Sequence, residues 1–199
     1  MPEDTPPLTD DEIRQELARR AAEGYDTDDE LLEAVVEVLQ DEHPEETELA
    51  ARVGRLAPEV FRSREEVERT WSVPTDNDRL DRAFTALERA GIVARQHFTC
   101  CQTCGHAEIG DDVDDGARGY TFFHQQDTER AAEGGGLYLA YGAFLPEGTS
   151  KEEYLRVQTQ IGHEIVAALR AEGLEPSWSG EVTQRISLPL TWRRRRPRR

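Results

Sequence analysis

The sequence lacks long apolar runs, an export signal and paired cysteines. No apolar stretch approaches the roughly 20 residues that a transmembrane helix needs. The first residues, Met1-Pro2-Glu3-Asp4-Thr5, are acidic where a signal peptide is basic. Three cysteines, confined to residues 100–104, form an odd and clustered set that does not resemble a disulfide framework. We therefore expect a cytoplasmic protein without membrane contact.

Basic residues are few and unevenly placed. The 24 lysines and arginines stand against 41 acids, for a net charge of −17, and six of the 24 lie in the last seven residues, 193–199. An acidic body repels nucleic acid. Residues 76–90, the would-be recognition helix of a winged helix-turn-helix, hold more acids than bases. These charges argue against a nucleic-acid partner and leave an unidentified protein partner open. The basic tail can touch RNA or a membrane surface, fold against the acidic body or stay solvated.

The first half of the sequence has the apolar spacing of helices. Pro44 suits the first position of a helix. Pro58 is expected to interrupt that helix, and Ser63 with Glu66 has the spacing of a capping box that begins another. We expect a helical region over residues 1–74.

The second half predicts strands around one long helix. In the last strand Ile186 and Leu188 are expected to face the core, while Arg185 and Ser187 face water. Pro189 suggests an edge or a bulge there. The fold class is therefore expected to be α+β, with a mostly antiparallel sheet of four or five strands packed on one long helix. The expected boundaries are strands near 92–98, 119–125, 137–144 and 182–192, the helix over 150–173, and an α+β domain over 75–199 that ends in the basic tail.

The cysteines form the main candidate site. Cys101-Gln102-Thr103-Cys104-Gly105 can form a turn that brings two thiolates to one ion, as in a zinc knuckle. Zinc takes four ligands, and no second CxxC pair exists. The remaining ligands would come from Cys100, His106, His97 or His124.

Two other interpretations of the cysteines stay open. Thr99 and Gln102 can form a capping box that starts a helix at Cys100. A thiolate in the first turn of that helix would be stabilised, and Cys104 would lie within reach as a resolving thiol. Alternatively, the three small side chains only fill a corner between a strand and a helix.

His124 marks a second polar site, where an apolar strand runs into charged residues. It can act as a base oriented by Asp127 or Glu129, or serve as a metal ligand. The simpler interpretation is that Asp127 or Thr128 caps a short helix and His124 lies at the strand edge.

Four motifs resemble those of an uncharacterised bacterial domain family. They are FTCCQTCGHAEI (98–109), GYTFFHQQDTER (119–130), LYLAYGAF (137–144) and RISLPLTWRRRR (185–196). The resemblance covers about residues 90–196, with or without the helix directly before them, and leaves the N-terminal helices outside. It implies a cytoplasmic bacterial protein and supplies no reaction, ligand or catalytic residue.

Together these features predict a small binding or regulatory module with a cysteine-rich site that holds zinc. The alternative is a thiol-dependent enzyme or redox sensor that uses Cys100, Cys101 and Cys104. A third possibility is a partner-binding protein without chemistry. The residue pattern does not decide whether the protein is an enzyme.

Overall fold

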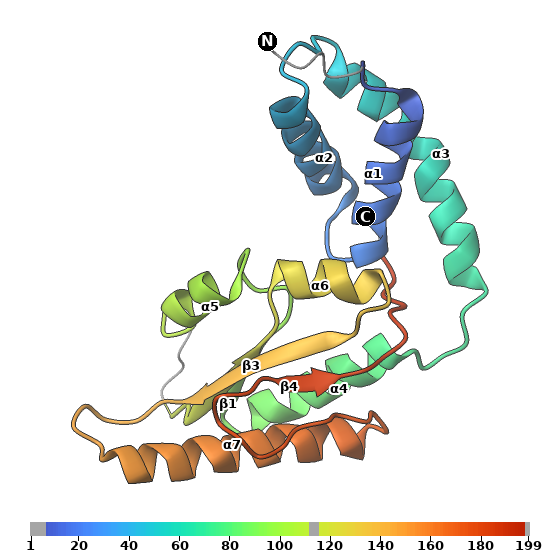
Figure 1. Cartoon of the computed structure of the whole chain (residues 1–199). Coiled ribbons are helices and arrows are strands. Elements are labelled where there is room, and N and C mark those ends of the chain that lie inside the picture. Colours follow the sequence, from blue (N-terminus) through green and yellow to red (C-terminus); the bar gives the residue numbers. More distant parts are fainter. Residues whose placement is uncertain (1–6, 112–115, 198–199) are drawn as a thin grey trace. The chain divides into compact units, whose positions relative to one another are not determined.

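The computed structural model describes residues 7–111 and 116–197 (Figure 1). Within these residues the chain forms two compact units. A helical unit draws on Met1–Ser72 together with Arg194–Arg199, and an α+β unit draws on Val73–Arg193. The expected division at residues 1–74 and 75–199 stays a prediction.

Three helices build the helical unit: α1 (Asp10–Glu23), α2 (Asp28–Glu42) and α3 (Leu49–Arg69). Thr9 and Thr27 cap the first two, each in a complete capping box that satisfies backbone groups at the helix start. The apolar faces of all three helices meet in one core. Its largest buried members include Ile13, Leu17, Leu31, Val35, Leu49, Val53 and Leu56.

Helix α3 corrects the expected break at Pro58. The helix begins at Leu49, not at Pro44, and runs through Pro58 as one element. Proline removes one helical hydrogen bond at that position. The buried face nevertheless continues from Val53 and Leu56 to partly buried residues beyond Pro58. Core packing therefore keeps the helix intact, and Ser63 with Glu66 lies in its interior.

The α+β unit contains a four-stranded sheet in the order β1-β2-β3-β4. β1 pairs parallel to β2, and the other two pairings are antiparallel. This confirms the α+β class and the mostly antiparallel sheet. The elements are α4 (Asp76–Arg89), β1 (Ile92–Arg95), α5 (Gln102–Glu108), β2 (Gly119–Phe122), α6 (Gln125–Ala132), β3 (Leu137–Ala143), α7 (Lys151–Ala171) and β4 (Ile186–Leu188).

Both faces of the sheet are covered (Figure 1). The long helix α7 packs on β2 and β3, with α4 beside it against β1. On β2 the side chains alternate: an added Cβ at Gly119 would meet Ile161 of α7, while Phe122 packs against Gly105 of α5. Helix α5 therefore lies on the opposite face of β2 from α7.

The last strand is shorter than expected. β4 spans only Ile186–Leu188. At its C-terminal end Pro189 has no N–H to continue the ladder. Beyond it the backbone N–H of Thr191 donates to Asp76 at 2.9 Å, and that of Arg193 donates to Asn77 at 2.6 Å. Side chains at the start of α4 thus take the place of a partner strand.

The basic tail packs within the helical unit. The Arg196 guanidinium lies 3.9 Å from the centre of the Phe61 ring and pairs with Asp28 at 2.5 Å. Arg194 lies 4.3 Å from the ring centre of Tyr25, and its carbonyl accepts from Arg64 at 3.0 Å. Arg194 and Arg196 of the tail are therefore packed into this unit.

Replacing Arg196 with alanine should lower the free energy of unfolding by about 2 kcal/mol, because a mostly buried cation loses its ring and its carboxylate. Urea unfolding followed by circular dichroism measures this. Arg193→Ala is the matched control, since it removes the same charge from an exposed side chain. An equal loss in both variants would show that net charge, not packing of the tail, sets the effect.

Candidate metal centre

The cysteine segment is held in place at its start, just before Cys100. The Phe98 N–H donates to the Phe123 carbonyl at 2.9 Å, and the Gln125 N–H donates to the Thr99 carbonyl at 3.1 Å. His97 and Thr99 have positive φ angles of 52° and 55°, which are uncommon for residues with a side chain. These turns direct the chain from β1 into α5.

Helix α5 begins later than the capping-box interpretation predicted. It starts at Gln102 with Cys101 as the N-cap residue, not at Cys100. The Thr99 hydroxyl donates to the Cys101 carbonyl at 3.2 Å, so it is not the cap of this helix. Cys101 and Cys104 therefore occupy the N-cap and third positions of one helical turn.

The three sulfur atoms lie together. The Cys104 Sγ is 3.5 Å from the Cys100 Sγ and 3.7 Å from the Cys101 Sγ, and all three fit within 4.8 Å of one another. None is in a disulfide; Cys100 is exposed and the other two are partly buried. This confirms a compact cluster that is open to solvent. Sulfurs bound to one zinc ion at about 2.3 Å lie about 3.8 Å apart, so the spacing fits a shared ion.

The local backbone and the neighbouring thiols shift the pKa values of Cys101 and Cys104 in opposite directions. The backbone N–H of Cys104 lowers the pKa of the Cys101 thiol, with further help from the Cys104 thiol and the Thr103 N–H. The thiols of Cys100 and Cys101 raise the pKa of Cys104 to about 11. Cys101 is therefore the better nucleophile of the two, and a metal cation would favour the thiolate form of all three.

His106 and His124 lie outside this group. Within residues 7–111 and 116–197, no histidine or carboxylate joins the sulfurs at such close range. The His106 Nδ1 is 3.0 Å from the Tyr120 hydroxyl, and its Nε2 is 3.4 Å from Gln102. Burial, followed by the charge of Arg185, lowers the pKa of His106. His97 also has a different partner, with its Nδ1 2.9 Å from the Thr128 hydroxyl.

His124 is the N-cap of α6, which begins at Gln125 rather than after Asp127 or Thr128. Its Nδ1 accepts from the Asp127 N–H at 3.3 Å, and its Nε2 lies 3.0 Å from the Asp127 carboxylate. Burial lowers the pKa of His124, which favours the neutral ring. These contacts describe a helix cap and give His124 a structural role.

Asp127 and Arg185 form an ion pair that the sequence pattern did not predict. Asp127 is 1% exposed and accepts from Arg130 at 2.7 Å and from Arg185. Arg185 was expected to face water, but its guanidinium turns to this carboxylate and to the Tyr138 carbonyl. The partners are far apart in sequence, so strand alternation alone carried no signal for the pair.

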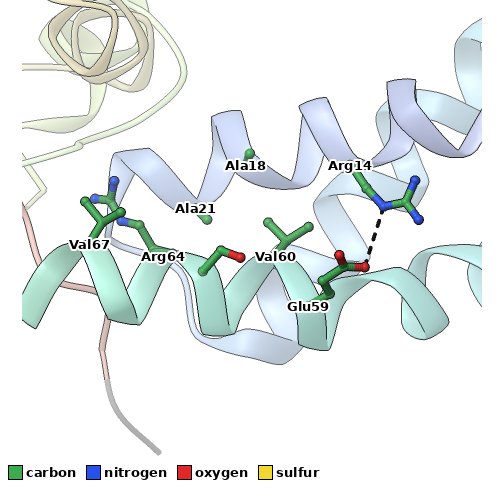
Figure 2. A pocket seen from close by; sticks show the side chains of 8 residues that line it. Arg14, Ala18, Ala21, Glu59, Val60, Arg64 and Val67 are labelled. Atoms are coloured by element: carbon green, nitrogen blue, oxygen red, sulfur yellow. Dashed lines mark ion pairs between the residues drawn. The ribbon is translucent and has the colours of Figure 1, made fainter.

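The helical unit has an apolar groove between α1 and α3 (Figure 2). Ala18, Ala21, Val60 and Val67 are among the residues that line its 380 Å³. An ion pair of Arg14 with Glu59, 3.8 Å long, joins the two helices beside it. The groove presents no cluster of nucleophiles or metal ligands among the side chains drawn.

None of the helices in the described part of the chain is long and apolar enough to cross a membrane. Fold and site thus define an α+β protein with a helical N-terminal unit and a three-cysteine cluster.

The chain belongs to the family described as "Domain of unknown function (DUF6891)", which matches residues 7–196. This confirms the resemblance to an uncharacterised domain family and corrects its extent, since the N-terminal helices fall inside the match. No curated protein and no solved structure matches the chain.

Proposed function

We propose that this protein is a small metal-binding module that holds one zinc ion through the thiolates of Cys100, Cys101 and Cys104. The observation that carries the proposal is the spacing of the sulfurs, 3.5 and 3.7 Å from Cys104. Soft thiolate ligands select zinc, copper(I) or iron–sulfur clusters over hard cations. The three free thiols also support a reducing compartment such as the cytoplasm.

Three protein ligands leave one position of a tetrahedral zinc ion for another group. His106 is the nearest candidate by sequence, and to bind it would have to leave Tyr120 or Gln102. His124 would have to leave the cap of α6. Water or a ligand from a partner protein needs no such rearrangement, so we assign the fourth position to an exogenous group. This open position supports a binding or regulatory role.

Metal analysis of the purified full chain tests the proposal. We expect about one zinc per chain, because one group of three thiols can supply one site. Cys101→Ser and Cys104→Ser should each weaken zinc binding more than about 100-fold, since loss of a supporting residue alone typically costs 10–100-fold. His106→Ala and His124→Ala should leave zinc binding unchanged, because we assign the fourth position to an exogenous group. His163→Ala is their control. Less than about 0.3 zinc per chain, with stability unchanged by a chelator, would overturn the proposal.

A second candidate function is thiol–disulfide exchange, which the unequal pKa values of Cys101 and Cys104 favour. The Cys101 thiolate would attack a disulfide substrate, RSSR′, to form a mixed disulfide with R′ and release RS⁻, which takes up a proton from water to give RSH. Cys104, 3.7 Å away, would then attack Cys101 of the mixed disulfide and release R′SH, leaving a protein disulfide.

Alkylation of the metal-free protein against pH measures this reactivity. We expect Cys101 to react at a pH below the usual thiol pKa of about 8.5 and before Cys104, because the thiolate is the reactive form. Peptide mass spectrometry assigns the modified residue. Modification of Cys104 first, or of neither thiol until strongly alkaline pH, would contradict the prediction.

A further inference from the structure

A small polar pocket lies at the edge of the sheet in the α+β unit. β4 pairs with β3 only over Leu137–Leu139, and beyond that pairing the chain leaves a cavity of 110 Å³. Helix α5, strand β3, helix α7 and the segment before β4 all contribute to its wall. The polar groups that matter here are Gln102, His106, Gln158, Thr183, Gln184 and Arg185.

The pocket is positive in a strongly acidic protein. The chain has 41 acids and a net charge of −17, yet among the residues that the structure describes, none that lines this cavity is Asp or Glu. Arg185 pairs with Asp127, but Arg130 takes the same carboxylate at 2.7 Å. One carboxylate therefore pairs with two guanidinium groups, so Asp127 does not neutralise Arg185 alone.

Arg185 also has an unused donor. Its hydrogen bonds to Asp127 and to the Tyr138 carbonyl both leave from Nη2. Its Nε is buried and has no hydrogen-bond acceptor among the described residues. A buried N–H without an acceptor is costly, and an unseen water or ion is one explanation for such a group in a native protein.

The other groups can present donors from separate directions. Gln184 accepts from the Ser179 hydroxyl at 3.0 Å through its Oε1, which leaves its NH₂ group for another acceptor. Gln102 reaches the wall from α5 and Gln158 from α7. Each side-chain amide supplies two N–H donors. Donors on several sides suit a tetrahedral group better than a flat one.

We propose that this pocket binds a small tetrahedral oxyanion of the phosphate or sulfate kind. Its 110 Å³ is well below the roughly 300–1,000 Å³ of sites for larger ligands, so it suits the oxyanion alone and not a nucleotide. Arg185 supplies the charge, and the glutamine amides supply directional hydrogen bonds. The inference goes beyond the zinc module and does not depend on bound metal.

Titration of the full chain with inorganic phosphate tests the proposal. Binding is measured by calorimetry at constant ionic strength. The protein is first treated with a chelator, so that phosphate cannot bind through a metal ion. We expect saturable binding of one phosphate per chain, competition by sulfate and none by acetate. The same result with Cys101→Ser would separate this site from the zinc centre.

Gln158→Glu is the decisive variant, because it places a negative charge in the pocket wall and leaves the Arg185–Asp127 pair intact. It should weaken phosphate binding at least about tenfold through like-charge repulsion. Gln15→Glu makes the same charge change on an exposed position of α1 and should leave the affinity unchanged. Absence of saturable binding, an unchanged affinity in Gln158→Glu, or an equal loss in both variants would overturn the proposal.

Discussion

Replacing Asp127 with alanine should lower the free energy of unfolding by about 3–5 kcal/mol, the usual cost of removing one partner from a buried ion pair. The carboxylate is almost fully buried and accepts from Arg130, Arg185 and the backbone N–H of His124. Without it, two guanidinium groups would face each other with no carboxylate between them. Urea unfolding of the full chain measures the loss.

Two controls show what Asp127 contributes. Asp127→Asn keeps the shape and the hydrogen-bonding oxygen but removes the charge. Its free energy of unfolding should therefore lie between those of the wild type and of Asp127→Ala. Glu133→Ala removes an exposed acid next to the same helix and should change stability by less than about 0.5 kcal/mol. A small effect of Asp127→Ala would mean that the two arginines find other partners.

Features with local signals can be predicted from a few residues of sequence. Thr9 and Thr75 stand directly before the helices that they cap, and the partner of each capping box is three residues away. The sulfur cluster is local in the same sense. A single helical turn brings Cys101 to Cys104, so five residues of sequence were enough to predict the candidate site.

The features that the sequence pattern did not predict depend on contacts between distant segments. Pro58 carries a strong local signal for a break, and packing of α3 on the other helices overrides it. Arg185 meets Asp127 across 58 residues. The oxyanion pocket joins residues of α5, β3, α7 and the segment before β4. The periodicity of a single segment cannot predict contacts of this kind between distant segments.

Gly105 lies in α5 next to Cys104 and packs against Phe122 of the sheet. Gly105→Ala should therefore lower both the stability of the fold and the affinity for zinc. An added Cβ would lie 2.6 Å from Cζ of Phe122, inside contact distance of a ring that is fully buried. The same ring packs against Phe98 and His106, which restrict its movement. We expect a loss of about 1–3 kcal/mol in unfolding free energy, typical of an overpacked core.

The clash should also weaken zinc binding, because the turn that carries Cys104 would have to move away from β2. Gly110→Ala is the matched control: it adds the same methyl group just after α5, where an added Cβ meets nothing within 4 Å. Zinc affinity and urea unfolding, measured on both variants, separate the two effects. Loss of stability in Gly105→Ala with unchanged zinc affinity would show that the sulfur cluster does not need close packing of α5 on the sheet.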